Sequence, residues 1–424
     1  MDNTDTWSLL YGAMVQGLRL STRTFQLVYP FTSWNWPATA PGYVAAAQYD
    51  FCATMPQWSG VGRYVSSGTR YNDSYGNFLS ILVPLSAPPE LQRQITLQQG
   101  AVQLCKNDYD TAYNQAALAY HEAVGGDNDP TFTDWLGTPE GSGWAALLDQ
   151  RYKAYEESVV VLEELVDQTQ DKALQAAMAA YHDPLTYVKY QDPGLSGFPK
   201  APGWWVSQTP SEWLQEVQAG RVPGADFSID MTQDPYDFGN TWAGGSRPVT
   251  SSLFAVSEEG VWRPLTPEEE QGIATVSISL AAWSTLAIGP YDWYSQSIVT
   301  SRAEGPFLAG YSGYPKPESN DVYLWGKGGA MELRKTGMMV AYQPVFTITF
   351  KDATRMLKSV EIVTGLRVGP LVQEFANAQR SSDRRLTLVS DASLNMPDVP
   401  QIFGVRIEEL PGAVAPRVAL GSGH

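Results

Sequence analysis

Between residues 86 and 184, apolar side chains recur every three, four or seven positions, which is the spacing of one helix face. The prolines of "SAPPE" at 86–90 suit a first helical turn, and Asp183-Pro184 ends the pattern because proline disfavours helix in the preceding residue. A loop running from "VGGDNDP" to "TPEGSG" divides the pattern into two stripes of similar length, so we expect a long antiparallel helical hairpin over 86–184. The first stripe comprises Leu91, Ile95, Val102, Cys105, Tyr109, Tyr113, Ala116 and Tyr120; the second comprises Leu148, Tyr152, Tyr155, Val159, Leu162, Val166, Ala173, Ala177 and Ala180.

The hydrophobic pattern is different on both sides of this hairpin. Residues 249–420 hold β-branched and aromatic runs separated by turn residues, which predict an antiparallel β domain of sandwich or barrel type. Residues 1–85 predict a mixed segment, with a short helix at 6–20 followed by strands that are candidates to pair with the C-terminal sheets. Within it, "NDSYGN" at 72–77 predicts a turn.

The remaining segments connect these parts. Residues 185–248 predict a loop-rich linker with one short helix, which a capping box of Thr209 and Glu212 begins. The ending "GSGH" at 421–424 looks like the remnant of an expression tag. The fold class expected from all segments is α+β: a long antiparallel helical hairpin inserted in, or preceding, a predominantly antiparallel β-sandwich or barrel-like domain. Insertion into one β domain and two separate domains both fit the pattern.

Charge restricts the partners. The formal net charge is −17, with no dense cluster of Lys and Arg, so we expect no nucleic-acid partner. Anionic membranes are disfavoured for the same reason, whereas neutral lipid and glycan surfaces are not. No apolar run reaches the ~18 residues of a membrane-spanning helix, and no signal peptide is visible. We therefore expect a cytoplasmic protein, or one released without a conventional signal.

Two internal histidines follow similar stretches, "AYHEA" at His121 and "AAYHDP" at His182. If each ends one helix of the hairpin, they lie about 50–60 Å apart and cannot share a ligand. A structural role at a helix C-terminus is then favoured for both. Cys52 and Cys105 match no zinc or redox spacing, and form either one disulfide or two free thiols.

Motifs for catalysis are scarce. "AGYSGY" at 309–314 does not have the spacing of a nucleophile elbow, and "GKGG" at 326–329 lacks the rest of a phosphate-binding loop. Carboxylates are the remaining candidates, and we expect no cofactor. The weak candidates for proton transfer are Asp230, Asp234 and Asp237, and the weak candidates for calcium binding are Asp127, Asp129 and Asp134.

Tryptophans in Gly- and Pro-rich loops are a more distinctive feature. On a loop, an exposed tryptophan can contact a sugar, a membrane interface or a partner protein, although such residues also cover cores. Alternating hydroxyl and apolar residues at 275–300 also predict a hairpin with one wet face, as in a β-pore or in an ordinary half-buried sheet. The candidate contact residues are Trp34, Trp36, Trp204, Trp205 and Trp293.

Three hypotheses for function remain. The first is a non-enzymatic binding or assembly protein that engages a membrane, a glycan or copies of itself, with a pore-forming-toxin-like protein as its most specific form. The second is an enzyme acting on a hydrophobic small molecule or a sugar in an aromatic-lined pocket, with carboxylates as its catalytic groups. The third is a structural component of a viral or secretion assembly.

Overall fold

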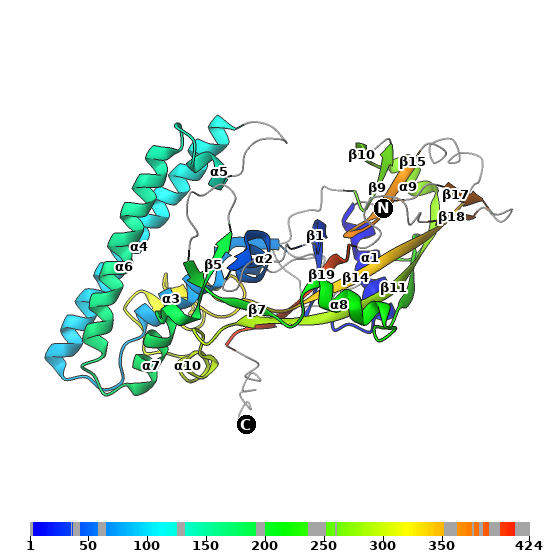
Figure 1. Ribbon diagram of the computed structural model, residues 1–424. Coiled ribbons are helices and arrows are strands. Elements are labelled where there is room, and N and C mark those ends of the chain that lie inside the picture. The colour runs from blue at the N-terminus through cyan, green and yellow to red at the C-terminus, as the bar shows by residue number, and fades with distance from the viewer. Residues whose placement is uncertain are drawn as a thin grey trace, which may run out of the picture.

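The computed structural model describes residues 3–34, 36, 43–57, 65–124, 132–191, 200–235, 252–258, 261–351, 363–374, 377–380, 385–389 and 399–411. Figure 1 shows a pair of long helices at one end of the molecule and a large sheet extending to the other end. Helices and a large antiparallel sheet confirm the expected α+β class.

Two strands of equal length form the centre of the main sheet. β11 (Ile273–Pro290) and β14 (Leu333–Phe350) each contain 18 residues, and they pair antiparallel from Ile273 opposite Phe350 to Ala287 opposite Gly337. β14 also pairs with β19 (Gln401–Glu409), and β19 pairs with β1 (Phe25–Ser33), so segments from the two ends of the sequence are neighbours. The sheet also contains β7 (Trp204–Val206), β8 (Ala225–Asp230), β17 (Asn377–Arg380) and β18 (Arg385–Val389).

A second sheet and α1 (Asn3–Gly17) enclose an apolar core with one half of these long strands. In this core, which we call the sheet core, Ile278 and Phe346 of the main sheet gather with Phe254 and Leu366 of the second sheet. The second sheet has the order β10 (Val261–Pro264), β9 (Phe254–Glu258), β15 (Val363–Val368) and β16 (Leu371–Glu374).

The long helices α4 (Pro89–Ala123) and α6 (Ser142–Val166) run antiparallel. Near one end Gln98 donates its side-chain amide to the Ser158 carbonyl at 2.7 Å, and farther along Asp108 lies 3.6 Å from Arg151. At the far end of the pair lies α5 (Phe132–Leu136). At its base lie α3 (Tyr71–Ile81), α7 (Lys172–Tyr181) and α10 (Gln296–Ser301), as Figure 1 shows.

The second core, which we call the helix core, lies where these helices meet the other half of the long strands. It contains Ala282 and Leu286 of β11 together with Met338 and Val340 of β14. β11 and β14 therefore contribute to both cores, and the long ladder connects the helical part of the molecule with the sheet part.

The second apolar stripe of the sequence does not form one continuous helix. α6 ends at Val166 and α7 begins at Lys172, because side chains between them bind the backbone. The Thr169 hydroxyl donates to the Val166 carbonyl at 2.7 Å, and Asp171 caps α7 by accepting from the Leu174 amide at 3.2 Å. Short polar side chains that compete for backbone groups favour such breaks.

Two further local predictions are wrong. The segment 296–301, expected as a strand, forms α10, because Ser295 caps it while Ile298 and Val299 are buried. The "NDSYGN" stretch, expected as a turn, lies in α3, where Tyr75, Phe78 and Leu79 face the helix core. In both places tertiary burial overrides local propensity. The capping box of Thr209 and Glu212, by contrast, is confirmed.

The remaining elements are short. They are α2 (Ala46–Ala53), α8 (Pro210–Gln218), α9 (Pro267–Gly272), η1 (Pro184–Thr186), β2 (Tyr43–Ala45), β3 (Thr54–Gln57), β4 (Val65–Arg70), β5 (Tyr187–Gln191), β6 (Lys200–Pro202), β12 (Tyr311–Ser312) and β13 (Val322–Tyr323). Among the helices of the described ranges, none combines the length and the apolar character that a membrane crossing requires.

Candidate functional site

An open cavity of about 570 Å³ lies between the end of α6 and α7. Its wall combines apolar side chains with several that can give or take a proton, which is the usual composition of a ligand site. The residues that line it are Glu163, Val166, Asp167, Gln175, Met178, Ala179, Ala180, His182, Asp183 and Pro184.

Glu163 and His182 face each other in this cavity, with Oε1 of Glu163 3.5 Å from Nε2 of His182. Burial raises the pKa of Glu163 to about 7, and the negative charge of Asp167 adds to the rise. Burial also lowers the pKa of His182 to about 4. Near neutral pH the imidazole is therefore uncharged and the carboxyl is partly protonated. The pair offers a proton donor and a proton acceptor side by side.

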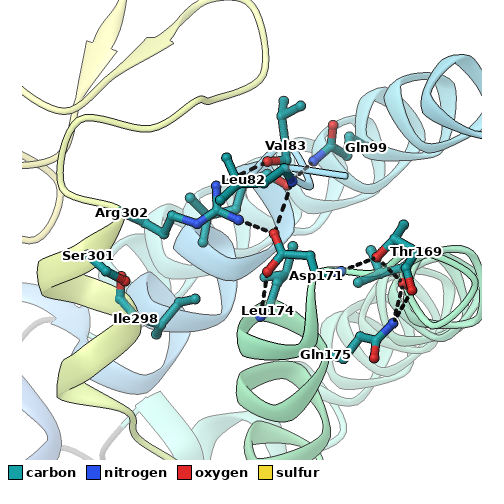
Figure 2. A network of polar contacts seen from close by, with 12 residues as sticks. Leu82, Val83, Gln99, Thr169, Asp171, Leu174, Gln175, Ile298, Ser301 and Arg302 are labelled. Atoms are coloured by element: carbon teal, nitrogen blue, oxygen red, sulfur yellow. Dashed lines mark hydrogen bonds and ion pairs between the residues drawn. The ribbon is translucent and has the colours of Figure 1, made fainter. Parts of the chain in front are cut away.

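A buried polar network holds α7 in place against α6 (Figure 2). The carboxylate of Asp171 accepts hydrogen bonds from the Leu85 amide at 3.0 Å and from the Leu174 amide at 3.2 Å. It also forms a buried ion pair with Arg302, which directly follows α10, and Arg302 donates to the Val83 carbonyl at 3.5 Å. α7, α10 and the connection from α3 to α4 are thus fixed to one carboxylate.

The same bracing continues on either side of Asp171. The Gln99 side chain of α4 donates to the carbonyls of Ser80 and Leu82 at 3.0 and 2.8 Å. The Gln175 side chain of α7 donates to the Val166 carbonyl at 3.1 Å and to the Thr169 carbonyl at 2.9 Å. Side-chain amides therefore satisfy backbone carbonyls near the ends of α3 and α6, as the burial of polar groups requires.

A second acidic group, Asp73, lies in the first turn of α3. The side-chain amide of Asn72 donates a hydrogen bond to the carboxylate of Asp73 at 2.9 Å. Surrounding protein atoms remove water from the carboxyl and raise its pKa, although the charges of Arg70 and Lys106 oppose the rise. The residue nevertheless keeps exposed surface.

Tyrosines from four elements surround Asp73. Burial raises the pKa of each of them, and the charge of Asp73 adds to the rise, so all lie within electrostatic reach of it. The rings of Tyr109 and Tyr152 are 5.6 Å apart, and Tyr152 keeps 44% of its surface exposed. The five are Tyr109 of α4, Tyr152 and Tyr155 of α6, Tyr181 of α7 and Tyr187 of β5.

Tyr187 connects the tyrosines with the cavity, because Glu156, Glu163 and Asp73 all raise its pKa beyond the larger effect of burial, to about 12. Glu156 and Glu163 are seven residues apart on α6, so they lie on one side of the helix, about 10 Å apart along its axis. Burial also raises the pKa of Glu156. We call these groups together the acidic tyrosine site: Asp73, Glu156, Glu163, His182, Tyr109, Tyr152, Tyr155, Tyr181 and Tyr187.

The tryptophans singled out from the sequence lie elsewhere and are mostly covered. The side chains of Trp34, Trp36, Trp204 and Trp293 are buried in the helix core, where the Trp293 ring nitrogen donates to the Gly203 carbonyl at 2.5 Å. Trp205 alone among the five keeps substantial exposure, at 39%. Contact of these residues with a ligand or membrane stays a prediction.

The candidate carboxylates of the sequence are not gathered with the site. Asp230 ends β8 by accepting from the Thr232 amide at 2.9 Å, and such hydrogen bonds lower its pKa. Asp234 is exposed, and Asp237 lies outside the described residues. Asp127 and Asp129 also lie outside them, and the side chain of Asp134 in α5 is not described. Within the described ranges, no three His, Cys, Asp or Glu side chains gather as a metal ion would require.

The other residues that were considered for chemistry are also separate. His121 lies exposed in the last turn of α4, at the end of the helical pair opposite α7 (Figure 1). Cys52 and Cys105 are both free, and burial raises the pKa of the Cys52 thiol to about 12. A thiol held in its protonated form is a poor nucleophile.

Reasoning from the sequence missed most of the acidic tyrosine site. Asp73 lies in a stretch that resembles a turn, where an aspartate is common. Glu156 and Glu163 lie in a helical pattern, where glutamates are common on the solvent side. The available signal was the use of tyrosine, in place of leucine, at inward positions of both stripes, since a hydroxyl in an apolar stripe needs a polar partner. Comparison with family models, curated proteins and solved structures returns no significant match for this chain.

Proposed function

We propose that the protein is a non-enzymatic binding protein that holds a neutral glycan in the acidic tyrosine site. The observation that supports this proposal is the grouping of partly exposed tyrosine rings around Asp73 and Glu156, two carboxyls with raised pKa values. Aromatic rings pack against the apolar faces of sugars, and carboxyl groups exchange hydrogen bonds with sugar hydroxyls in either protonation state. The raised pKa values of Asp73 and Glu156 also favour a neutral ligand over a cationic one, because burial works against the charged form of each carboxyl.

A membrane surface is the less favoured partner of the same binding protein. Four of the five loop tryptophans are buried, so in this conformation they offer no ring to a lipid interface. The pore-forming form of the hypothesis would need β11 to leave its partners β8 and β14. The domain plan that accompanies our proposal is the one expected from the sequence: a helical hairpin over 86–184 that is inserted in, or precedes, a β-sandwich or barrel-like domain.

An array of neutral oligosaccharides, followed by calorimetric titration of the one that binds best, tests the proposal. Tyr152→Ala should weaken binding by about two- to twelvefold, because packing on one aromatic ring contributes about 0.5–1.5 kcal/mol. Tyr314→Ala is the matched control, since Tyr314 is 40% exposed and does not belong to the site. Absence of any bound oligosaccharide, or equal losses in the two variants, would refute glycan binding at this site.

A second candidate function, an enzyme acting on the same class of ligand, is supported by the Glu163–His182 pair in the cavity. A carboxyl whose pKa lies at about 7 is suited to act as a general acid near neutral pH. The titrated oligosaccharide itself distinguishes the two functions. Recovery of intact sugar after prolonged incubation supports binding alone, whereas shortened products that disappear in Glu163→Gln support the enzyme.

A further inference from the structure

The face of α4 that points away from its buried side carries a line of exposed leucines. Leu97 is 68% exposed, and Leu104 and Leu118 are each 64% exposed. Their spacings of 7 and 14 residues are whole heptads, so the three side chains lie along one line on the helix. Ile95 and Val102, at other positions of the helix turn, are buried. α4 therefore has a second apolar line that no described residue covers.

The polar residues around this line are almost uncharged. Between the leucines the exposed positions of the same face are Gly100, Asn107, Asp108, Thr111, Asn114 and Gln115, and Asp108 carries the one charge among them. The nearby carboxylate of Asp108 is already paired with Arg151 of α6. A solvated helix face normally carries Lys and Glu, as the outer face of α6 does. The composition of this face is closer to that of a helix seam than to that of a free surface.

The two charged ends of the line are complementary to each other. Arg93 stands four residues before Leu97, where it forms an exposed ion pair with Glu90 at 3.0 Å, and Glu122 stands four residues after Leu118. When the helix is turned end to end, Leu97 therefore falls on Leu118 and Arg93 falls on Glu122. Such reversal symmetry makes a face complementary to a second copy of itself. In a parallel arrangement Arg93 would instead meet Arg93, and Glu122 would meet Glu122.

We infer that a second copy of this chain docks on this face, with the two α4 helices antiparallel about a twofold axis between Asn107 and Asp108. The interface pairs Leu97 of one copy with Leu118 of the other, and Arg93 with Glu122. With three leucines per copy, the dimer is weak and forms at micromolar or higher concentration. This inference goes beyond the proposed function and does not depend on the ligand of the acidic tyrosine site.

Light scattering coupled to size-exclusion chromatography tests the dimer over a concentration series of the full chain. The unmodified protein should shift from monomer toward dimer as its concentration rises, and Leu104→Asp should remain a monomer throughout. Leu185→Asp is the matched control, because Leu185 is 90% exposed and lies outside α4, so it should dimerise like the unmodified protein. A protein that stays monomeric up to millimolar concentration overturns the inference.

Disulfide cross-linking determines the orientation in a Cys105→Ser background. A mixture of Leu97→Cys chains and Leu118→Cys chains should form a mixed disulfide, whereas neither chain alone should cross-link with itself. In the antiparallel dimer the two copies of residue 97 are about 30 Å apart, which is 21 residues along the helix and far beyond the reach of a disulfide. Cross-linking within each variant alone, without the mixed product, refutes the antiparallel arrangement.

A charge exchange tests the pairing of the ends. Arg93→Glu and Glu122→Arg should each weaken the dimer roughly tenfold, because each creates two like-charge contacts. The double variant Arg93→Glu/Glu122→Arg should restore the original affinity, since the opposite charges meet again. A double variant that dimerises no better than the single variants would contradict the proposed register.

Discussion

The two cores of this molecule are stabilised by different kinds of contact. The sheet core around Ile278 and Phe346 gathers aliphatic and aromatic side chains, and the buried side-chain amide of Gln373 accepts from the Phe346 backbone amide at 2.9 Å beside them. At the base of the helices, by contrast, the buried side chains of Asp171, Arg302 and Gln99 form directional hydrogen bonds with backbone amides and carbonyls near the helix ends. Apolar contacts stabilise without fixing an angle, whereas hydrogen-bond networks impose one orientation. The candidate site lies beside the directional network, where the positions of α6 and α7 are most closely defined.

The largest difference between the cores should appear when the buried ion pair is broken. Arg302→Met leaves the Asp171 carboxylate buried without its countercharge, which should reduce the free energy of unfolding by about 3–5 kcal/mol. Urea unfolding of the full chain measures the loss. The double variant Asp171→Asn/Arg302→Met buries no charge and should regain at least half of it. A loss below about 1 kcal/mol in the single variant would show that the network does not stabilise this region.

A smaller effect, specific to the helical region, should depend on pH. The pKa of Glu163 is raised from 4.5 to about 7 in the folded protein, so folding is progressively penalised as pH rises between these values. Glu163→Gln removes that penalty and should be more stable than the unmodified protein by about 2 kcal/mol at pH 8, with little of this gain at pH 4.

The control for this prediction lies in the same cavity. The lowered pKa of His182 makes the folded state less stable as pH falls from 6.5 through 4, and this contribution is present in both proteins, so it cancels in their difference. Thermal unfolding of both proteins across pH 4–8 measures the difference. A gain of the same size at both ends of this range would argue against a raised carboxyl pKa.

The smallest effect should come from the sheet core. Ile278→Val removes one methylene group from a fully packed position and should reduce stability by about 1 kcal/mol. Because no titratable group is involved, the loss should not change between pH 4 and pH 8. A pH-dependent loss at this position would contradict the distinction between an apolar sheet core and a polar helical base.

Part of this architecture could be predicted from the sequence because local pattern determines it. Helical periodicity over 89–123 identified α4, and alternating β-branched residues from 249 onward indicated strands. The division between α6 and α7 was missed, because it depends on Thr169 and Asp171 binding backbone groups instead of continuing the helix. Apolar spacing is the same in both cases, so periodicity alone does not reveal a break.

The candidate site was harder to predict because its members are distant in the sequence. Asp73, Tyr109, Glu156 and Tyr187 come from four separate elements, and only tertiary packing brings them within electrostatic reach. For the tryptophans in Gly- and Pro-rich stretches, the sequence left exposure and burial both open. Trp293 is fully buried and hydrogen-bonded. Local sequence indicates where the chain turns, and it does not indicate what covers a side chain.

The pairing of β1 with β19 also has a consequence for synthesis on the ribosome. β1 is translated before its partner β19, and residues 34–400 separate the two strands. β14 also pairs with β19, so one of its edges likewise lacks a partner until β19 is translated. Until then the nascent chain presents unpaired strand edges, which readily associate with other chains. The main sheet is completed only when β19 emerges, and the cell has to shield those edges until that point.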